Sequence, residues 1–230
     1  MSSEREELES GLRSLGLTAT PAQVQSLLMF LEQLDQTNQS FNLTRIARHD
    51  FVKLHVLDSL VALQALPATH GLSILDIGTG AGFPGVPIAA LLPDCSITLL
   101  DSTAKKVRFA SETARACSIA NVSGIHGRAE MLAHTPEYRE KFDVVTSRAV
   151  APFRTLIEWM LPLVKVGGLA LALKGSGFEE EMAGCEDLLT DLGAEAPSVL
   201  SATLPGTEIE RYVIAIQKRA ETQKRLPRVK

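Results

Sequence analysis

The residues best suited to chemistry lie in one glycine-rich segment between Leu72 and Pro87. An apolar run ends there in Asp76, and glycines follow at positions 78, 80, 82 and 85. Glycine adopts positive φ angles and lets a ligand come close to the main chain. A helix that begins at the following prolines would point its free N–H groups at the same place. The segment therefore predicts a binding loop for a nucleotide-like molecule, with Gly78 and Gly80 against the ligand.

Two ligands are compatible with this loop. Gly80–Gly85 has the spacing G-x-G-x-x-G, and Asp101 follows about 20 residues later, as in sites for NAD. Asp76, however, would repel a pyrophosphate and would suit the cationic amino-acid moiety of S-adenosylmethionine. Asp101 and Ser102, at the end of the next predicted strand, would suit the ribose hydroxyls of the same molecule. We therefore favour S-adenosylmethionine as the cofactor and keep an NAD-dependent oxidoreductase as the less favoured alternative.

Two further segments should reach the same ligand edge. The loop after the third predicted strand, Gly127–Glu130, borders the adenine in this type of fold, where Ala129 and Glu130 can contact it. An acid at position 130 is also typical of the first turn of a helix, with no ligand at all. Lys174 ends a later buried strand at this edge, where a lysine can equally extend its charge into solvent.

The segment Ser147–Pro152 should report on the methyl acceptor, because it follows the fourth predicted strand. It lacks the Asn or Asp followed by Pro-Pro and an aromatic residue that is usual in enzymes acting on exocyclic amines. The cysteines, which could attack a pyrimidine, lie elsewhere in the chain. Arg148 stays protonated, so it is a poor general base but can hold a carboxylate, a phosphate or a stacked base. We expect no catalytic base, a positioning role for Arg148, and an acceptor that needs no deprotonation.

Alternating apolar segments must position these residues. Short strands are predicted at 72–77, 96–101, 122–126, 141–147, 168–174, 198–204 and 209–217, with helices at 84–92, 103–117, 153–165 and 178–192. This alternation predicts an α/β fold with a doubly wound, mostly parallel seven-stranded sheet. A tight turn at 204–206 makes the last strand antiparallel, which is typical of Rossmann-like methyltransferases. We expect a helical extension over residues 1–66, with two helices in 4–36 and a third near 50–65, a methyltransferase domain over 67–218 and a basic tail over 219–230.

Charge and composition indicate which partners, metal sites and cellular compartment to expect. The net charge is −4, yet residues 217–230 carry six basic residues against one acid, and residues 177–195 carry seven acids and no lysine or arginine. The basic tail is expected to be solvated and disordered, with contact to phosphates as the alternative. Three widely spaced cysteines indicate neither a disulfide framework nor a metal site. No apolar run is long enough to span a membrane and the N-terminus is unlike a secretory signal, so we expect a cytoplasmic protein.

Several motifs together resemble one known family, the glucose-inhibited division protein B family of bacterial 16S ribosomal RNA guanine-N7 methyltransferases. The motifs run in family order across nearly the whole chain and comprise Phe41–Thr44, His55–Ser59, Asp76–Pro87, Leu100–Ser102, Ser147–Ala149 and Leu173–Gly175. The resemblance implies that Gly78 and Phe83 line the cofactor, that Ala129 and Glu130 hold its adenine side, and that Arg148 closes the site.

The resemblance also implies the acceptor and the partner. Guanine N7 has a lone pair and no proton to lose, in agreement with the absence of a predicted base. We expect 16S ribosomal RNA to be bound within the 30S subunit or an assembly intermediate, by a monomeric enzyme. The candidate substrate-binding residues are Arg45, His55 and Lys174, and Arg48, Lys53 and Arg148 are further candidates for phosphate contacts. A methyltransferase of the same fold acting on a small molecule or a protein is the alternative.

Overall fold

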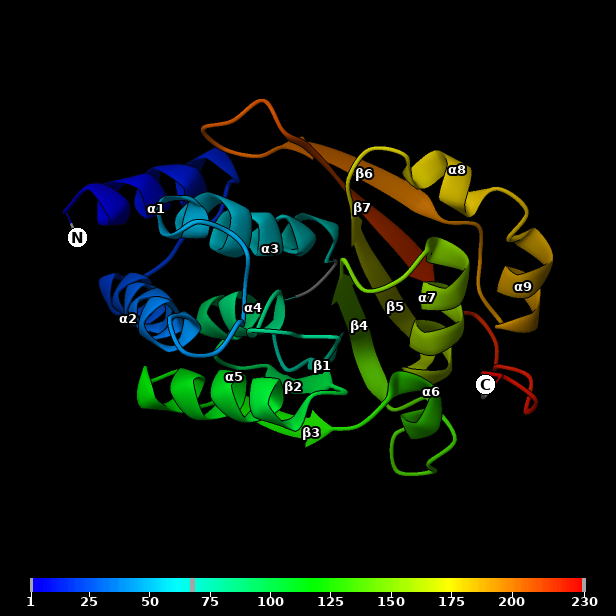
Figure 1. Ribbon diagram of the computed structural model, residues 1–230. Helices are drawn as coiled ribbons and strands as arrows, with labels where there is room; N and C mark the ends of the chain where they lie inside the picture. Colours follow the sequence, from blue (N-terminus) through cyan, green and yellow to red (C-terminus); the bar gives the residue numbers. More distant parts are fainter. Residues whose placement is uncertain (1, 67–68, 229–230) are drawn as a thin grey trace.

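A seven-stranded sheet forms the centre of the computed structural model, which describes residues 2–66 and 69–228 (Figure 1). The strands are β1 (Ser73–Ile77), β2 (Ser96–Asp101), β3 (Val122–His126), β4 (Phe142–Arg148), β5 (Val164–Lys174), β6 (Ser198–Thr203) and β7 (Glu210–Gln217). Their spatial order is β3-β2-β1-β4-β5-β7-β6. Strands β1 to β5 pair in parallel, whereas β7 runs antiparallel to both β5 and β6. The predicted fold class is confirmed.

The strand order places a crevice at one edge of the sheet. Chain order reverses next to β1, since β2 lies on one side of β1 and β4 on the other. In open parallel sheets, ligands bind at such a reversal, outside the carboxyl ends of the strands. The loops after β1, β2, β3 and β4 all lie at this edge, so residues distant in sequence are brought together there.

Helices cover both faces of the sheet (Figure 1). The α-helices are α1 (Ser2–Ser14), α2 (Pro21–Asn38), α3 (Asp58–Leu60), α4 (Gly85–Leu91), α5 (Ala104–Ala116), α6 (Ala129–Leu132), α7 (Phe153–Met160), α8 (Phe178–Met182) and α9 (Glu186–Asp191). Shorter or irregular turns are η1 (Arg48–Asp50), η3 (Val61–Ala65) and η4 (Leu161–Leu163), which are 3₁₀-helices, and η2 (Phe51–Leu57), a π-helix. The third predicted helix, near 50–65, therefore changes its hydrogen-bond pattern three times.

Two predicted helices are shorter in the structure than in the sequence analysis. The helix expected over 153–165 ends at Met160, and β5 begins at Val164, earlier than the expected strand. Pro162 lies between them and cannot donate the backbone hydrogen bond that a continuing helix needs. The helix expected over 178–192 is divided into α8 and α9 near Gly184, whose φ of 72° lies in the left-handed region.

Two apolar cores lie on opposite sides of the sheet. Ile74 faces one core and the adjacent Leu75 faces the other, as the alternation of side chains along a strand requires. The first core contains the buried residues of α1, α2, η2, α4 and α5, and the second contains those of α6, α7 and α9. The N-terminal helices therefore share a core with one face of the sheet. The expected boundary of the helical extension at 66/67 adjoins residues outside the described part of the chain.

The C-terminal segment differs from the prediction of a solvated tail, because it packs against the protein. Leu226 and Thr222 are buried, and Lys218 is fully buried. The Nζ of Lys218 donates to Glu140 Oε1 (2.9 Å) and to Thr222 Oγ1 (2.6 Å). Arg139 donates to three backbone carbonyls of the segment, including that of Leu226 (2.9 Å). Burial of Leu226 and pairing of the cations explain why this segment packs against the protein, which composition alone did not predict. Lys230 lies outside the described residues. Within the described ranges, no helix is both long and apolar enough to cross a membrane.

Candidate active site

The glycine loop after β1 crosses the end of β2. Gly78 and Gly80 have φ angles of 69° and 58°, a conformation that glycine adopts without strain. The Gly78 N–H donates to the carbonyl of Leu100 (2.8 Å), which fixes the loop on the neighbouring strand. A Cβ atom on Gly78 would lie only 2.3 Å from a methyl group of Val150. The loop therefore needs glycine at position 78 for two separate reasons.

Two carboxylates hold this loop, and they differ in exposure. Asp101 accepts hydrogen bonds from the N–H groups of Gly80 (3.0 Å) and Thr103 (2.8 Å) and lines a cavity. Asp76 has no exposed area, and its carboxylate accepts the N–H of Gly85 (2.9 Å). Burial raises the pKa of Asp76 to about 7, against the opposing effects of its hydrogen bonds and of the nearby Arg148. The interpretation of Asp76 as a direct partner of a ligand was wrong, since its carboxylate lies beneath the loop.

A cavity of about 390 Å³ lies between the loops that follow β1, β2 and β3. It is lined by Ile77, Gly78, Leu100, Asp101, Ser102, Thr103, Lys106, Gly127, Arg128, Ala129, Glu130, Val150 and Trp159. The structure thus brings together five of the residues predicted to bind the cofactor. The others, Gly80, Phe83 and Arg148, do not line this cavity. We call it the first cavity.

Phe83 lies beneath the loop and not in the first cavity. It is 4% exposed and stacks on the imidazole of His55, with ring centroids 4.2 Å apart. Its edge contacts Phe30 of α2, and the guanidinium of Arg148 lies 5.6 Å from its ring centroid. Phe83 therefore connects the glycine loop to the helical extension and to Arg148.

Arg148, at the end of β4, is held by side chains and backbone from the helical extension. Its Nη1 donates to the carbonyl of Leu54 (2.9 Å) and to Asp58 Oδ2 (2.7 Å). Its Nη2 lies 3.3 Å from His55 Nδ1. Arg211 of β7 donates from Nε to the other carboxylate oxygen of Asp58 (2.6 Å). One buried carboxylate therefore positions two guanidinium groups.

His55 is a neutral part of this network. Burial, with a contribution from the charge of Arg148, lowers the pKa of His55 to about 3. Because a guanidinium only donates, Nδ1 of His55 accepts and the ring proton lies on Nε2. That nitrogen is 2.9 Å from Thr44 Oγ1, so the imidazole donates to the threonine. His55 does not line the first cavity, and its role in the network is to accept a hydrogen bond from Arg148.

A second cavity, of about 610 Å³, opens on the other side of the turn after β4. It is lined by Ile46, Leu54, Asp58, Arg148, Ala149, Val150, Ala151, Pro152, Leu173, Lys174, Gly175, Glu181 and Arg211. Val150 lines both cavities, so the two meet at the end of β4. Ala149 has a φ of 56°, a strained conformation for a residue other than glycine, and such strain is often found at functional sites.

The remaining predicted substrate residues have different surroundings. Lys174 lines the second cavity and donates to the Ala151 carbonyl (2.9 Å) and to Glu181 (2.6 Å). Arg45 is exposed and has no partner among the residues that the structure describes, and its neighbour Ile46 lines the cavity. The phosphate candidates Arg48 and Lys53 instead form ion pairs with acids of α1, to Glu4 and Glu7 respectively.

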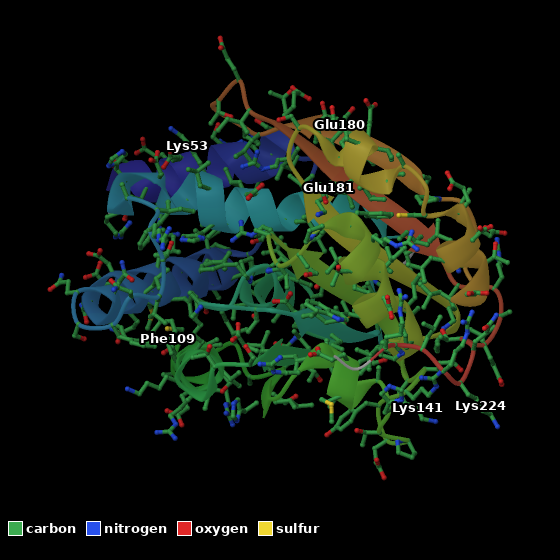
Figure 2. All side chains as sticks on the ribbon, turned by 45° about the vertical axis from the view of Figure 1, so that its right-hand side comes forward. Lys53, Phe109, Lys141, Glu180, Glu181 and Lys224 are labelled. Atoms are coloured by element: carbon green, nitrogen blue, oxygen red, sulfur yellow. The ribbon has the colours of Figure 1, made fainter. Side chains whose placement is uncertain are left out.

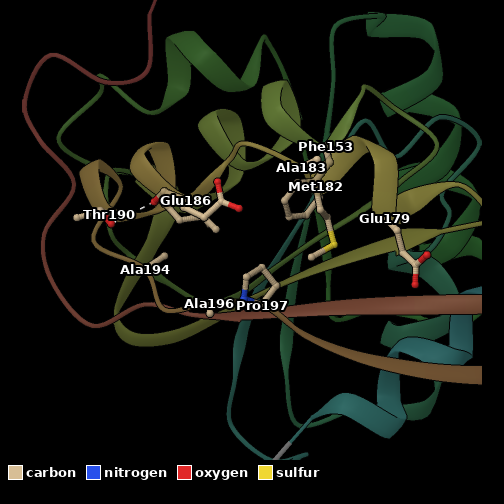
Figure 3. Close-up of a pocket in the computed structure, with 10 residues that line it drawn as sticks. Phe153, Glu179, Met182, Ala183, Glu186, Thr190, Ala194, Ala196 and Pro197 are labelled. Atoms are coloured by element: carbon tan, nitrogen blue, oxygen red, sulfur yellow. Dashed lines mark hydrogen bonds between the residues drawn. The ribbon is translucent and has the colours of Figure 1, made fainter.

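A further cavity, of about 460 Å³, is lined by residues of α8, of α9 and of the segment that precedes β6 (Figure 3). Its lining includes Met182, Phe153 and Pro197, with Glu179 and Glu186 at its edge (Figure 3). It contains none of the residues predicted to bind the cofactor or the substrate. The two cavities lie on different sides of α8. Met182 lines this further cavity, whereas Glu181 lines only the second cavity.

Sequence reasoning missed three contributors to the site. Trp159 lies on α7, a helix whose sequence pattern indicates only an apolar face. Arg211 lies on β7, which β4 and β5 separate from β1, and Glu181 lies on α8; no local motif marks either residue. A guide was available for Trp159, since it is the one tryptophan of the sequence and follows the fourth predicted strand.

The sheet order, the glycine loop and the paired cavities define a Rossmann-like protein of the methyltransferase class. Solved structures agree on the fold. Aeropyrum pernix fibrillarin in complex with S-adenosyl-L-methionine aligns with a TM-score of 0.53 and 17% identity over 68% of this chain and 73% of that one. A protein described as a predicted O-methyltransferase, from Agrobacterium tumefaciens, gives 0.57 and 18% over 72% and 83%.

Sequence comparison places the chain more closely. Residues 23–210 match the family described as rRNA small subunit methyltransferase G. Ribosomal RNA small subunit methyltransferase G of Alkaliphilus oremlandii is 38% identical over 96% of this chain and 93% of that protein. The protein of the same name from Lactobacillus delbrueckii subsp. bulgaricus is 41% identical over 91% and 89%. The chain belongs to this family, as its motifs predicted.

Proposed function

We propose that this protein transfers a methyl group from S-adenosylmethionine to N7 of a guanine in 16S ribosomal RNA. The observation that carries the proposal is the meeting of two cavities at Val150, beside the guanidinium of Arg148. Family membership supports the class of reaction and of substrate. The first cavity is the site for the methyl donor, and the second receives the acceptor base.

The residues of the first cavity fit a nucleoside with a cationic amino-acid group. Gly78 presents its main chain in the wall of this cavity, where a Cβ atom would collide with Val150, and Asp101 keeps acceptor capacity beside Ser102 for ribose hydroxyls. Ala129 and Glu130 provide an apolar wall and an acceptor for the adenine end. When bound, S-adenosylmethionine supplies an electrophilic methyl group and a leaving group that takes no proton.

The second cavity suits an acceptor that attacks without deprotonation. Arg148 is permanently protonated, and His55 donates its ring proton to Thr44 and is turned away from the cavity. Neither residue can remove a proton from a substrate, and the Glu181 carboxylate at the edge of the cavity is engaged by Lys174. Guanine N7 carries an in-plane lone pair and needs only to be aligned, so the fixed guanidinium of Arg148 has a positioning role.

The charges around the second cavity suit a nucleotide of RNA. Arg148 and Arg211 retain donors beyond those used by Asp58, and exposed Arg45 lies next to the cavity residue Ile46. In A-form RNA, N7 lies in a deep and narrow groove, so the target is a nucleotide outside a regular helix. We propose that this monomer acts in the cytoplasm on the 30S subunit or an assembly intermediate.

Two measurements test the proposal. Equilibrium dialysis against labelled S-adenosylmethionine and labelled NAD should show binding of the first alone, and preference for NAD would contradict the assignment of the first cavity. Methyl transfer to 30S subunits that lack N7-methylguanine should then create a site of borohydride and aniline cleavage. Subunits that already carry the modification are the control. An enzyme that binds the methyl donor but produces no cleavage would act on another acceptor, such as a small molecule or a protein.

A further inference from the structure

Glu181 and Lys174 form a pair at the edge of the second cavity. Lys174 is the last residue of β5 and Glu181 lies on the short helix α8; both line the cavity. Lys174 Nζ donates to Glu181 Oε2 (2.6 Å) and to the carbonyl of Ala151 (2.9 Å). Ala151 follows Val150, the residue common to both cavities. The pair therefore lies in the second cavity, close to Val150, where the two cavities meet.

The two oxygens of the Glu181 carboxylate have different roles. Oε2 accepts from Lys174 and also from the N–H of Phe153 (2.7 Å), the first residue of α7. Oε1 has no hydrogen-bond partner among the described residues. The hydrogen bond from Lys174 is the largest influence on the carboxyl group and lowers the pKa of Glu181, so the side chain is ionised at neutral pH. A carboxylate fixed through one oxygen thus presents the other as an acceptor.

Asp58, the other carboxylate of the cavity, has no such freedom. One of its oxygens accepts from Arg148 and the other from Arg211. Its side chain is 7% exposed, whereas that of Glu181 is 37% exposed. Of the two acids, Glu181 is the one able to accept hydrogen bonds from an incoming base.

We propose that Lys174 and Glu181 read the Watson–Crick edge of the acceptor guanine, an inference that rests on the proposed function. Guanine presents on that edge an acceptor, O6, beside two adjacent donors, N1–H and N2–H. Lys174 keeps one of its three N–H donors for O6, and Glu181 Oε1 accepts from N1–H and N2–H. Adenine has the opposite pattern at these positions and would place its 6-amino group against the ammonium of Lys174. The pair therefore selects guanine.

The same contact favours the reaction as well as the base. N7 lies on the Hoogsteen edge of the purine, next to O6, so recognition of the Watson–Crick edge leaves N7 free to face the first cavity. Formation of the new N7–carbon bond makes the purine cationic without release of a proton. A carboxylate on N1–H stabilises that developing charge.

The test combines a change in the protein with a change in the base. The target nucleotide is first mapped with the unmodified protein on 30S subunits. Ribosomal RNA with either guanosine or inosine at that nucleotide is then made by ligation, reconstituted into subunits, and used with tritiated S-adenosylmethionine. Inosine keeps N7, O6 and N1–H but lacks the 2-amino group, so it removes one of the two donors to Glu181.

The wild-type protein should methylate the guanosine subunits roughly 10- to 100-fold faster than the inosine subunits at subsaturating concentration. In Glu181→Gln the amide oxygen can still accept from Lys174 and Phe153, but an NH₂ group replaces Oε1 and cannot accept. This variant should be slowed on guanosine, and its guanosine-to-inosine ratio should fall towards 1. Glu180→Gln, which changes the exposed neighbour on α8 (Figure 2), should keep the wild-type ratio.

Binding of the methyl donor separates a folding defect from a loss of recognition. Trp159 is the one tryptophan of the chain and lines the first cavity, so its fluorescence reports S-adenosylmethionine binding in every variant. Glu181→Gln should bind the methyl donor with wild-type affinity. Equal wild-type rates on guanosine and inosine would overturn this inference and leave the proposed function intact. Absence of any methylation by the wild-type protein would overturn the proposed function itself.

Discussion

At the scale of single residues, the candidate site depends on a glycine that has no room for a side chain and on two buried titratable groups. Gly78 combines a positive φ with a neighbour, Val150, that leaves no space for a side chain. Asp76 and His55 are titratable groups held without access to solvent. Burial penalises the charged form of each, so it lowers the pKa of His55 to about 3 and raises the pKa of Asp76 to about 7.

Gly78→Ala should weaken S-adenosylmethionine binding by more than about tenfold, because the new methyl group displaces Val150 from the wall of the first cavity. Titration followed by Trp159 fluorescence measures the change. Gly71→Ala is a matched control, since Gly71 also has a positive φ (66°) but has open space around it. Both variants should lose about 1 kcal/mol of stability from backbone strain. Equal affinities for the two variants would show that position 78 is not in contact with the methyl donor.

Asp76 should make the stability of the protein depend on pH in an unusual direction. Its pKa is about 7 when folded and near 3.8 when unfolded, so the folded state binds the proton more tightly. The free energy of unfolding therefore falls as pH rises from about 4 to about 7. Asp76→Asn does not titrate, so its stability relative to wild type should increase over this range, by at most about 4 kcal/mol. Urea unfolding of both proteins at several pH values measures this difference in free energy. The titration of His55 occurs in both proteins and cancels in the difference. Parallel curves of unfolding free energy against pH would contradict the raised pKa of Asp76.

At the scale of elements, the site is held by segments that come from opposite ends of the chain. The π-helix η2 supplies His55 and the carbonyl of Leu54 to Arg148, and β7 supplies Arg211 to Asp58. The C-terminal segment after β7 is held separately, by Arg139 and by buried Lys218. Burial lowers the pKa of Lys218, while its hydrogen bond to Glu140 opposes this effect. Each element is placed by polar contacts that bridge distant parts of the sequence.

Arg139→Ala should release the C-terminal segment without unfolding the sheet. The variant loses hydrogen bonds from a charged donor to the carbonyls of Thr222 and Leu226, each worth about 1.5–3 kcal/mol. Hydrogen exchange of amides 219–228 should become much faster, with exchange in β1 and β4 unchanged. Lys224→Ala is the control, because Lys224 is exposed and has no partner within the described part of the chain. Equal protection in Arg139→Ala and wild type would mean that burial of Leu226 is sufficient to hold the segment.

At the scale of the whole molecule, positive charge is less available than the sequence indicates. The net charge is −4, and the arginines of the C-terminal segment form ion pairs with Glu195, Asp191 and Glu158. Arg48 and Lys53 are likewise neutralised by acids of α1. Arg45, next to the cavity residue Ile46, is exposed and has no acidic partner within the described part of the chain, so it is a candidate for a phosphate contact.

Arg45→Ala should weaken binding of the protein to 30S subunits and reduce the dependence on salt. If Arg45 contacts one phosphate, the slope of log affinity against log salt concentration should fall by about 0.7–0.9. Arg48→Ala removes a cation of the same type three residues away that is already paired with Glu4, so its slope should stay near that of wild type. Filter binding at several salt concentrations measures both slopes, and equal slopes for wild type and Arg45→Ala would exclude a phosphate contact at position 45.

The sequence by itself determined the features that depend on neighbouring residues. Strands such as β2 and β3 agree with the predicted ranges because apolar periodicity is a local property. The positive φ angles of Gly78 and Gly80 were expected for the same reason, since only glycine adopts them easily. The family motifs, which also lie in short continuous segments, predicted the family and the side of the sheet that carries the site.

Only the tertiary structure decided which of those residues line a cavity. Arg148 is 94 positions from Leu54 and Asp58 is 153 positions from Arg211, and no local pattern encodes such contacts. Asp76 and Phe83 are buried beneath the glycine loop, although the place of Asp76 at a strand end and the family resemblance for Phe83 predicted contact with the cofactor. The sequence showed Glu181 only as one acid of the stretch 177–195, and its pairing with Lys174 depends on the packing of α8 against the end of β5. Side-chain exposure is set by long-range packing, so it could not be read from residue type and spacing alone.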